Sequence, residues 1–385
     1  MRFADNRNKI GKYIPAVVFL IFIYGMALWF IFSPKPDYSS SEKRYLQKFP
    51  EVTAEKLLSG DFGSEFETFF ADRFPQRNTW VGLNAYTALA EGNNGASGVY
   101  NCKNGYLINK PVSTENNLDK NIGAVADFAK SIDTPTTVML VPSTGYIVDD
   151  VLPTFHDKYN DDEDISKISS MLSKDKIGFV DLRERFKSEY KNGSQLYYKT
   201  DHHWTTKGAY TGYQELCKAL GITPIDDSTL KKDSYPDFYG TTYSSSGFWL
   251  TPPDNIEIWN NPKNSDRNIS VKITEGANIK TSGSMYFTDH LKEDDKYPVF
   301  IDGNHALTEI TNTNAKNGTI LLIKDSFSHS LAPFLAENYS KVVLVDLRYY
   351  KESVSDLVTT YNPEQVVVLY GIDNLATDTD IVWLK

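Results

Sequence analysis

The residue types best suited to chemistry are an acid and two histidines in one short segment and a serine much further along the chain. The segment is Asp201-His202-His203-Trp204, and Ser326 follows it after about 120 residues. A serine hydroxyl is a weak nucleophile at neutral pH, so an imidazole must take its proton, and a carboxylate must orient that imidazole and stabilise its charged form. These residues therefore predict a site for nucleophilic acyl transfer.

The spacing within the first segment suggests a role for each residue. In extended backbone, residues two apart project to the same side, so the carboxylate of Asp201 can reach one ring nitrogen of His203. On a helix this pair would not face each other, but the threonines at 205–206 are typical of a helix start and leave the motif in the preceding loop. We therefore expect Asp201 to orient His203, which acts as the base for Ser326. We expect His202 to point the other way as a supporting residue.

Ser326 stands at the junction of an expected strand and an expected helix. The apolar, partly β-branched run at 319–323 is typical of a buried strand, and 328–338 has helical periodicity. The first amides of that helix are candidates for binding a developing oxyanion. Gly240 and Thr241 are a second candidate pair of oxyanion donors. The alternative is that this serine only caps the helix.

The elements that must position these residues alternate along the chain. Strands are expected at 136–141, 178–182, 319–323, 342–346 and 365–370, and helices at 116–131, 164–174, 205–219, 328–338 and 351–361. This alternation predicts an α/β fold, with a mostly parallel sheet and flanking helices. In open sheets of this kind ligands bind beyond the carboxyl ends of the strands, which is where Ser326 falls.

A different pattern, of short β-like pieces rich in aromatics and turns, occupies residues 228–300. Aromatic faces beside small polar groups suit sugar binding, and Trp204, Tyr239 and Trp249 are the candidate substrate-binding residues. The alternative is a loop that packs its aromatics over the sheet.

The N-terminal segment has the composition of a membrane anchor. Residues 13–32 are twenty residues without a charge, enough to cross a bilayer as a helix. Basic residues precede them, which places the N-terminus in the cytoplasm and the rest of the chain outside. A cleaved signal peptide is the alternative, although no Ala-x-Ala-like site follows. The expected organisation is a cytoplasmic tail at 1–12, an anchor at 13–33, a linker and helical segment at 34–95, and a catalytic domain at 96–385 with an insertion at about 228–300.

Composition narrows the function further. A net charge of -10 argues against nucleic-acid binding, and a hydrophobic content of 41% with 13% aromatics describes a globular protein. Cys102 and Cys217 are the only cysteines, and the sequence does not decide whether they pair. No metal site is expected, because adjacent histidines usually diverge and the remaining histidines lack ligand spacing.

Several motifs together resemble the DHHW family of bacterial surface proteins. They are Asp-His-His-Trp followed by Thr-Thr-Lys-Gly-Ala-Tyr, then Leu-Leu-Ile-Lys-Asp-Ser-Phe, and the segments at 71–77, 105–108, 331–335, 345–350 and 366–370. The family is SGNH-hydrolase-like and similar to the O-acetyltransferases of alginate and of Gram-positive cell-wall polysaccharides. In the alginate relatives the motifs are Asp-x-His-Trp and Asp-Ser-Phe, which map onto Asp201, His203 and Ser326. Lys324 is a departure, because those relatives usually have glycine there.

The resemblance implies a membrane-anchored, extracytoplasmic O-acetyltransferase that modifies hydroxyls of a cell-envelope polysaccharide through an acyl-serine intermediate. It implies no soluble cofactor, and a multi-pass membrane acyltransferase as the partner that supplies acetyl groups. Two alternatives stay open: a carbohydrate esterase or deacetylase with the same triad, and a non-catalytic glycan-binding assembly protein.

Overall fold

The computed structural model describes residues 2–112 and 117–384. The chain divides into two compact units, Met1–Asn84 and Ala85–Lys385. In the first unit, helix α1 (Arg2–Phe32) contains the apolar stretch Tyr13–Phe32, with a mean hydropathy of 2.4. Its length and composition suffice to cross a membrane, and a signal sequence shares both properties.

Three helices follow α1, where the sequence predicts helix from 51 to about 90. They are α2 (Ala54–Ser59), α3 (Asp61–Asp72) and α4 (Arg77–Ala90). The expected helix is interrupted at Gly60, whose positive φ of 86° ends α2. Pro75 falls in the break between α3 and α4, where it has no amide hydrogen to continue the helical ladder.

The segment after α1 is fastened to the end of α3. Strands β1 (Tyr38–Ser39) and β2 (Arg44–Tyr45) pair as a small hairpin. Arg44 donates two hydrogen bonds to the buried carboxylate of Asp72, at 2.9 and 2.6 Å. Arg73 donates to the carbonyl oxygens of residues 35 and 36. The Asp-Arg pair of the 71–77 motif therefore has a structural role within this unit.

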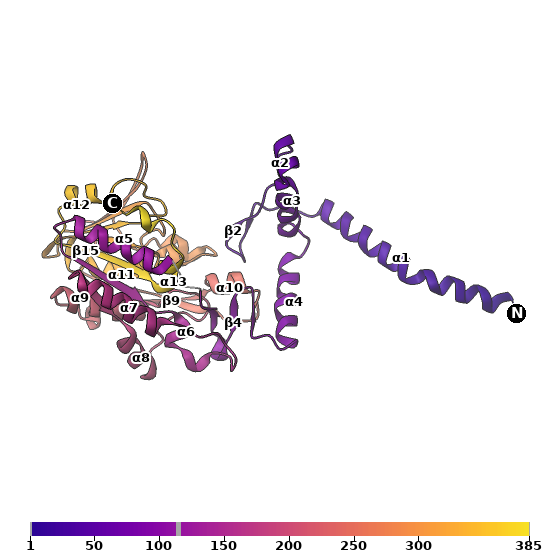
Figure 1. Cartoon of the computed structure of the whole chain (residues 1–385), viewed down its shortest axis with the longest axis horizontal. Helices are drawn as coiled ribbons and strands as arrows, with labels where there is room; N and C mark the ends of the chain where they lie inside the picture. The colour runs from indigo at the N-terminus through magenta and orange to yellow at the C-terminus, as the bar shows by residue number, and fades with distance from the viewer. Residues whose placement is uncertain (1, 113–116, 385) are drawn as a thin grey trace. The chain divides into compact units, whose positions relative to one another are not determined.

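The second unit is built on an eight-stranded sheet, with helices on both of its faces (Figure 1). Five neighbouring strands run parallel in the order β14-β13-β15-β6-β7. They are β6 (Thr136–Val141), β7 (Gly178–Asp181), β13 (Asn317–Lys324), β14 (Tyr339–Val345) and β15 (Gln365–Gly371). These are the five strands predicted from the sequence, and the α/β class with a mostly parallel sheet is confirmed.

Alternating residues of the parallel strands enter two separate cores. One face packs against α6 (Thr144–Ile147), α8 (Arg183–Lys191), α9 (Thr206–Leu220) and α11 (Ser328–Leu335). The other packs against α5 (Asn117–Ser131), α7 (Asp161–Lys174), α12 (Val354–Tyr361) and α13 (Ile372–Thr377). Burial on both faces explains the near-continuous apolar runs of these strands. The helix expected over 116–131 is α5, and residue 116 lies outside the described residues.

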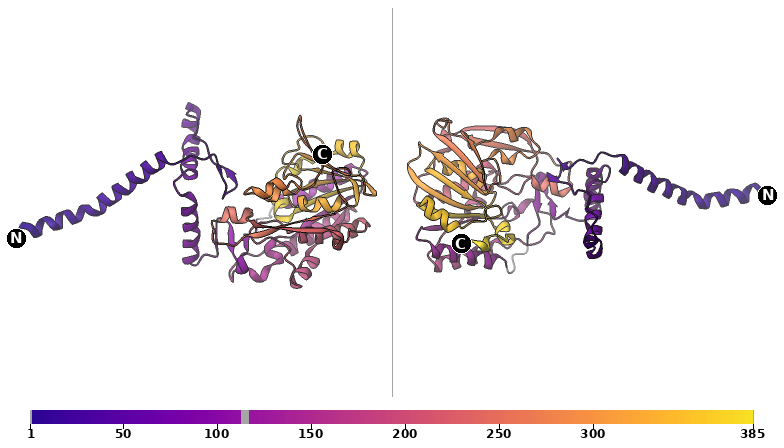
Figure 2. Two further views of the ribbon diagram at one scale, coloured as in Figure 1. Left: turned by 180° about the vertical axis from the view of Figure 1, so that it is seen from behind. Right: turned by 90° about the horizontal axis from the view of Figure 1, so that it is seen from above.

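The region at 228–300 contributes to the sheet rather than forming a separate aromatic loop. Strands β10 (Ile269–Glu275) and β11 (Asn278–Ser282) join β12 (Leu307–Asn312) as an antiparallel extension beside β14 (Figure 2). Strands β8 (Lys231–Phe238) and β9 (Asp254–Asn260) pair with each other, and α10 (Thr241–Ser246) lies between them in the chain. A further small sheet comprises β3 (Gly95–Ala96), β4 (Val99–Asn101) and β5 (Leu107–Asn109).

The carboxyl ends of the parallel strands gather polar residues at one edge of the sheet. Ser143 follows β6, Ser326 follows β13, Asp346 follows β14, and Asp373 and Asn374 follow β15. Because these strands are parallel neighbours, the residues after them meet at the same edge. The candidate nucleophile is therefore surrounded by the segments that follow neighbouring strands.

Candidate active site

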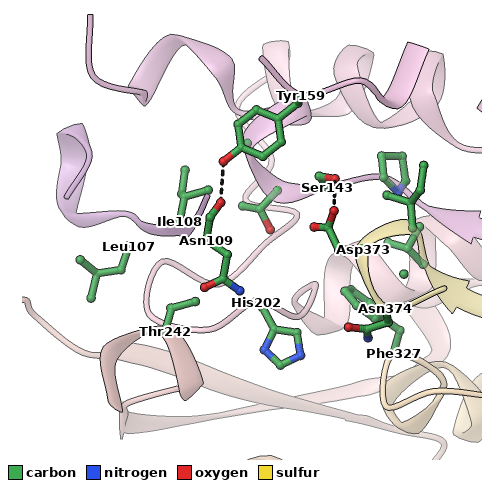
Figure 3. Close-up of a pocket in the computed structure, with 16 residues that line it drawn as sticks. Leu107, Ile108, Asn109, Ser143, Tyr159, His202, Thr242, Phe327, Asp373 and Asn374 are labelled. Carbon is green, nitrogen blue, oxygen red and sulfur yellow. Dashed lines mark hydrogen bonds between the residues drawn. The ribbon is translucent and has the colours of Figure 1, made fainter. Parts of the chain in front are cut away.

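A small cavity of about 50 Å³ lies at this edge (Figure 3). Its lining combines residues that follow β6 and β15 with residues of the histidine segment and of α10. Among them are Ser143, His202, Thr242, Phe327, Asp373 and Asn374.

The histidine segment forms a tight loop, and the buried carboxylate of Asp254 holds the backbone before it through hydrogen bonds. Tyr197 and Trp204 form an isolated β-bridge that closes the loop. Asp254 accepts hydrogen bonds from the amides of Lys199 and Thr200, at 2.9 and 2.8 Å, and from the Thr200 hydroxyl at 2.8 Å. These bonds fix the backbone immediately before Asp-His-His-Trp, so the motif lies in the loop before α9, as predicted.

The structure brings Asp201, His203 and Ser326 together in one hydrogen-bonded chain. Oδ1 of Asp201 lies 2.5 Å from Nδ1 of His203, and Nε2 of His203 lies 2.6 Å from Oγ of Ser326. All three residues are buried, at 2%, 4% and 8% exposure. The serine hydroxyl can therefore pass its proton to the imidazole while the carboxylate holds the opposite nitrogen.

Asp201 is kept ionised by its surroundings. Burial alone would raise the pKa of Asp201, but the neighbouring imidazoles of His203 and His202, together with hydrogen bonds from His203 and Thr241, hold that pKa well below its usual value. The amide and hydroxyl of Thr241 donate to Oδ2 of Asp201 at 2.7 and 3.1 Å. Gly240 makes this approach possible, because a Cβ there would lie 2.1 Å from the Cβ of Asp201.

This contact corrects the suggestion that Gly240 and Thr241 supply oxyanion donors. The Gly240 amide donates to the Thr200 hydroxyl at 3.2 Å, and the Thr241 amide donates to Asp201. Both donors are engaged at the acid end of the chain of hydrogen bonds, away from the serine. The pair instead positions the candidate acid.

The ring of His203 is packed between two other rings. Tyr297 stacks on it with centroids 4.0 Å apart and an interplanar angle of 10°, and His202 lies 3.9 Å away at 37°. Two rings cannot share one face at these distances, so they cover opposite faces. The Tyr297 hydroxyl also donates to the Ser326 carbonyl oxygen at 3.2 Å. Sequence reasoning missed Tyr297, whose only signal was its place in the aromatic-rich region.

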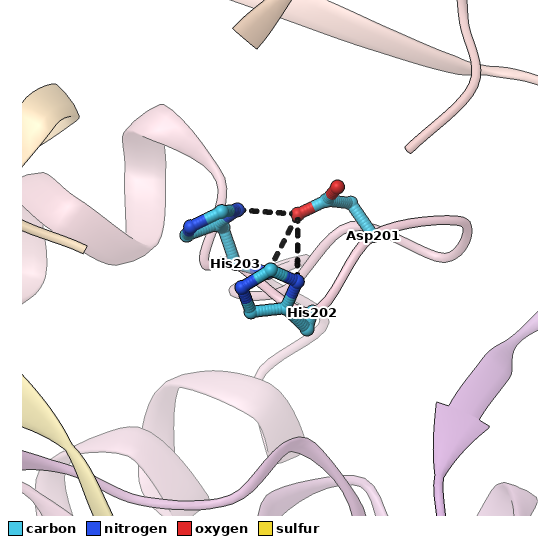
Figure 4. Close-up of side chains that lie close together, drawn as sticks. All are labelled: Asp201, His202 and His203. Carbon is cyan, nitrogen blue, oxygen red and sulfur yellow. Dashed lines mark hydrogen bonds and ion pairs between the residues drawn. The ribbon is translucent and has the colours of Figure 1, made fainter. Parts of the chain in front are cut away.

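His202 does not point away from Asp201, contrary to expectation. The loop bends at these residues instead of running extended, and Nδ1 of His202 lies 3.8 Å from Oδ1 of Asp201 (Figure 4). Asp201, His202 and His203 each offer a potential ligand atom within 4.8 Å of the others. Both nitrogens of His203 and Nδ1 of His202 already have hydrogen-bond partners, which favours a hydrogen-bonded cluster over metal coordination.

The turn that carries Ser326 is organised by the acid before it. The carboxylate of Asp325 accepts from the amides of Phe327 and Gly371, at 3.0 and 2.8 Å, and from Nδ2 of Asn374 at 2.7 Å. The first amides of α11 bond within this turn, to the carbonyl oxygens of Asp325 and Ser326. Among residues 2–112 and 117–384, the Ser326 amide has no hydrogen-bond acceptor. That amide, rather than the helix terminus, is free to bind a developing oxyanion.

Trp204 is a support for the serine turn and not a sugar-binding surface. Its side chain is completely buried, so a glycan cannot reach it. Nε1 donates to the Phe327 carbonyl oxygen at 3.0 Å and to the Ser330 hydroxyl at 2.9 Å. The assignment of Trp204 as a substrate-binding residue is therefore wrong.

The other two aromatic candidates form a half-buried cluster around α10. Tyr243 lies between them, with centroid distances of 4.4 Å to Tyr239 and 5.1 Å to Trp249. Their contact with a sugar stays a prediction.

Lys324, the departure from the alginate relatives, takes part in a buried ion pair beneath the serine turn. Its ammonium lies 2.8 Å from Asp346 and 2.8 Å from Nε2 of His329. Burial lowers the pKa of Lys324, and the charge of Asp346 opposes that shift. Arg348 also binds Asp346, at 2.8 and 2.6 Å.

The cysteines are free thiols, and both are buried. Burial raises the pKa of Cys102 and of Cys217 to about 12, so both stay protonated at neutral pH.

Comparison with known proteins identifies the relatives of this chain. A family model described as DHHW protein matches residues 109–345, more than half of the sequence. A DHHW family protein from Eubacterium siraeum has 17% identity and a TM-score of 0.63, over 75% of this chain and 95% of that one. PatB1 from Bacillus cereus, solved with a sulfonyl adduct, has 20% identity and a TM-score of 0.61, over 74% and 97%.

The O-acetyltransferase domain of AlgJ from Pseudomonas putida is a looser match, with 14% identity and a TM-score of 0.48, over 75% and 95%. A search of curated proteins gave no match. The likenesses to the Eubacterium siraeum protein and to PatB1 establish a shared fold.

Proposed function

The chain belongs to the DHHW family, and from that premise we propose that it is an extracytoplasmic O-acetyltransferase acting on a cell-envelope polysaccharide. One observation carries the proposal: the hydrogen-bonded chain from Asp201 through His203 to Ser326, at 2.5 and 2.6 Å. A buried acid, an imidazole and a hydroxyl in this order are the parts that acyl transfer needs.

In the first half of the proposed reaction, Ser326 attacks the carbonyl carbon of an acetyl donor. Nε2 of His203 takes the hydroxyl proton as the new ester bond forms, and Asp201 stabilises the imidazolium. The Ser326 amide is the proposed donor to the developing oxyanion. His203 then gives its proton to the leaving group, and an acetyl-serine remains.

In the second half, a sugar hydroxyl attacks the acetyl-serine. His203 takes the proton of that hydroxyl, the ester bond to Ser326 breaks, and the proton returns to the serine oxygen. The acetyl group leaves on the sugar, and the enzyme regains its starting protonation state.

The surroundings of this reaction are part of the proposal. Residues 13–33 act as a membrane anchor and residues 96–385 as the extracellular catalytic domain, with a cytoplasmic tail at 1–12. A multi-pass membrane acyltransferase supplies the acetyl groups. The length and hydropathy of Tyr13–Phe32 support the anchor.

The proposal is tested by the full-length protein in detergent with an activated acetyl ester. Ser326→Ala is expected to lower acetate release by about 10³-fold or more, because no acyl-serine can form. Ser355→Ala, in α12, is the matched control and keeps the wild-type rate. Equal acetate release by the wild type and Ser326→Ala would overturn the proposed nucleophile.

An acetyltransferase and an esterase are distinguished by the products that they form. In the presence of an oligosaccharide, an acetyltransferase places acetyl groups on the sugar, whereas an esterase releases all of them to water. Mass spectrometry of the oligosaccharide measures that partition. Acetate release dependent on Ser326 with no sugar acetylation would favour the esterase.

A further inference from the structure

The proton positions on His202 follow from its partners. Nδ1 of His202 lies 2.5 Å from the Thr241 hydroxyl, which lies 3.1 Å from Oδ2 of Asp201. An ionised carboxylate only accepts hydrogen bonds, so the single hydrogen of Thr241 points to Asp201. The Thr241 oxygen must then accept from Nδ1 of His202. A neutral His202 therefore carries its proton on Nδ1 and a lone pair on Nε2.

His202 is neutral at physiological pH and has one ring nitrogen to spare. Burial, followed by the neighbouring His203, lowers the pKa of His202 to about 4. Across residues 2–112 and 117–384, no hydrogen bond to Nε2 of His202 is found. The side chain is 28% exposed and lines the small cavity, where its ring is seen between Thr242 and Asn374 in Figure 3.

Other polar groups of the cavity match a ligand that carries hydroxyls. Thr242 lines the cavity and is 1% exposed; its hydroxyl is closed to solvent and has no hydrogen-bond partner within the described part of the chain. Asp373 accepts from the Ser143 hydroxyl at 3.1 Å through one oxygen, and its second oxygen adds an acceptor to the lining. Donors and acceptors on one wall suit the edge of a sugar, since each sugar hydroxyl both donates and accepts.

The size of the cavity limits what it holds. A water molecule needs about 10–15 Å³ of such space, so 50 Å³ takes roughly three to five groups of that size. That is enough for the hydroxyl-bearing edge of one sugar ring, while the rest of a polysaccharide stays outside.

We propose that this cavity is the acceptor subsite, in which Nε2 of His202 accepts a hydrogen bond from a hydroxyl of the sugar that receives the acetyl group. The inference rests on the proposed function, because only acyl transfer needs a sugar acceptor. An acetyl group carries no O–H or N–H donor, so the lone pair of His202 suits a sugar hydroxyl rather than the acetyl group itself. Phe327 lines the same cavity and follows Ser326 directly, and the ring of His202 lies 3.9 Å from that of His203, so the cavity adjoins the serine turn and the candidate base.

The test measures glycan binding and needs no turnover. Chitopentaose and cellopentaose are titrated by calorimetry into full-length Ser326→Ala protein in detergent. His202→Asn in that background puts an amide where Nδ1 stands, so the donor to Thr241 is kept and the Nε2 lone pair is lost. His202→Gln puts its amide where Nε2 stands and can offer an oxygen acceptor to the sugar. His156→Asn, at an exposed histidine, is the matched control.

We expect His202→Asn to weaken binding of at least one glycan by about tenfold or more, as for the loss of one hydrogen bond that leaves a partner unsatisfied. His202→Gln recovers part of the affinity, and His156→Asn leaves it unchanged. Equal affinities in the His202→Asn and parent proteins would overturn the subsite, as would no binding of either glycan to the parent.

A failure of the proposed function has a different signature. Weaker binding in His202→Asn, with acetate release unchanged in Ser326→Ala, would leave the cavity as a glycan site and overturn its role as an acceptor subsite. Acetate release dependent on Ser326 with no effect of His202→Asn on binding would overturn only the subsite.

Discussion

The two halves of the candidate active site are held in place in different ways. The serine turn is tied to the sheet: Asp325 bonds to Gly371 and Asn374 at the end of β15, and the Lys324–Asp346 pair joins the ends of β13 and β14. The histidine loop is held mainly by side chains from residues 228–300.

Those side chains are Thr241, Asp254 and Tyr297, which contact the loop at Asp201, Thr200 and His203. None of the three belongs to the parallel strands. The candidate nucleophile therefore shares the stability of the sheet, whereas the candidate base and its acid depend on a segment that lies outside the parallel strands. Substitutions in the serine turn should therefore lower the free energy of unfolding of the whole unit. Substitutions around the histidine loop should mainly lower activity.

The largest effect is expected from Lys324→Met, which removes the buried ion pair beneath the serine turn. Met matches the apolar stem of lysine but leaves His329 without its partner and Asp346 with Arg348 alone. We expect the free energy of unfolding to fall by about 3 kcal/mol, the lower end for breaking a buried ion pair, because Arg348 still binds Asp346. Denaturant unfolding followed by circular dichroism measures the change.

The control for this variant is Lys341→Met, at a half-exposed lysine 3.7 Å from Glu309 in a neighbouring strand, where Lys272 still pairs with Glu309. That change should cost under about 1 kcal/mol. Similar losses in the two variants would mean that the buried pair does not link the serine turn to the sheet.

The next largest effect is expected from Gly240→Ala, which disturbs the histidine loop at Asp201. The new Cβ would overlap Asp201 and push the candidate acid away from His203. We expect acetate release to fall by about 100-fold, equivalent to roughly 2.7 kcal/mol, with a smaller loss of global stability than in Lys324→Met. Gly123→Ala in α5 is the control, because a Cβ there meets nothing within 4 Å. A global stability loss as large as that of Lys324→Met would contradict the proposed local coupling.

The smallest effect is expected from Asp373→Asn, which tests how a half-buried carboxyl group beside the serine turn makes stability depend on pH. Burial and the nearby carboxylate of Asp161 raise the pKa of Asp373 to about 7, although the Ser143 hydroxyl opposes the shift. The folded protein thus holds a proton that the unfolded chain has lost, so the free energy of unfolding falls as pH rises from about 4 to about 7.

Asparagine cannot ionise and removes this contribution. Asp373→Asn should be more stable than the wild type by about 1–2 kcal/mol at pH 8, a value reduced for solvent screening at this half-buried group, and the difference should vanish near pH 4. Thermal unfolding across this pH range measures it, and a difference that does not change with pH would contradict the buried charge.

Local patterns predicted most of the framework and part of the site. Strand β6 was predicted with the bounds it has, and β13, β14 and β15 within three residues at each end, because buried parallel strands are short apolar runs between turns. The spacing of Asp201 and His203 anticipated their contact, although the loop is bent where extended backbone was expected.

The wrong predictions concern residues whose roles depend on contacts with side chains far away in the sequence. Trp204 reads as a sugar-binding aromatic until the serine turn covers it, and Gly240 and Thr241 read as oxyanion donors until Asp201 takes the Thr241 amide. The aromatic-rich region around Tyr297 does not indicate its role, because that role depends on stacking against a ring far away in the sequence.

By itself, the sequence determined the alternation of strands and helices, the apolar segment near the N-terminus and the reactive residue types, because each depends on neighbours within a few positions. Only the tertiary structure decided that His203 meets Ser326 across 123 residues and that Thr241 fixes the proton of His202 on Nδ1. Such contacts exist only in the folded protein, where the sheet is assembled and side chains from residues 228–300 contact the histidine loop. No short stretch of sequence contains both partners, so no local pattern can specify them.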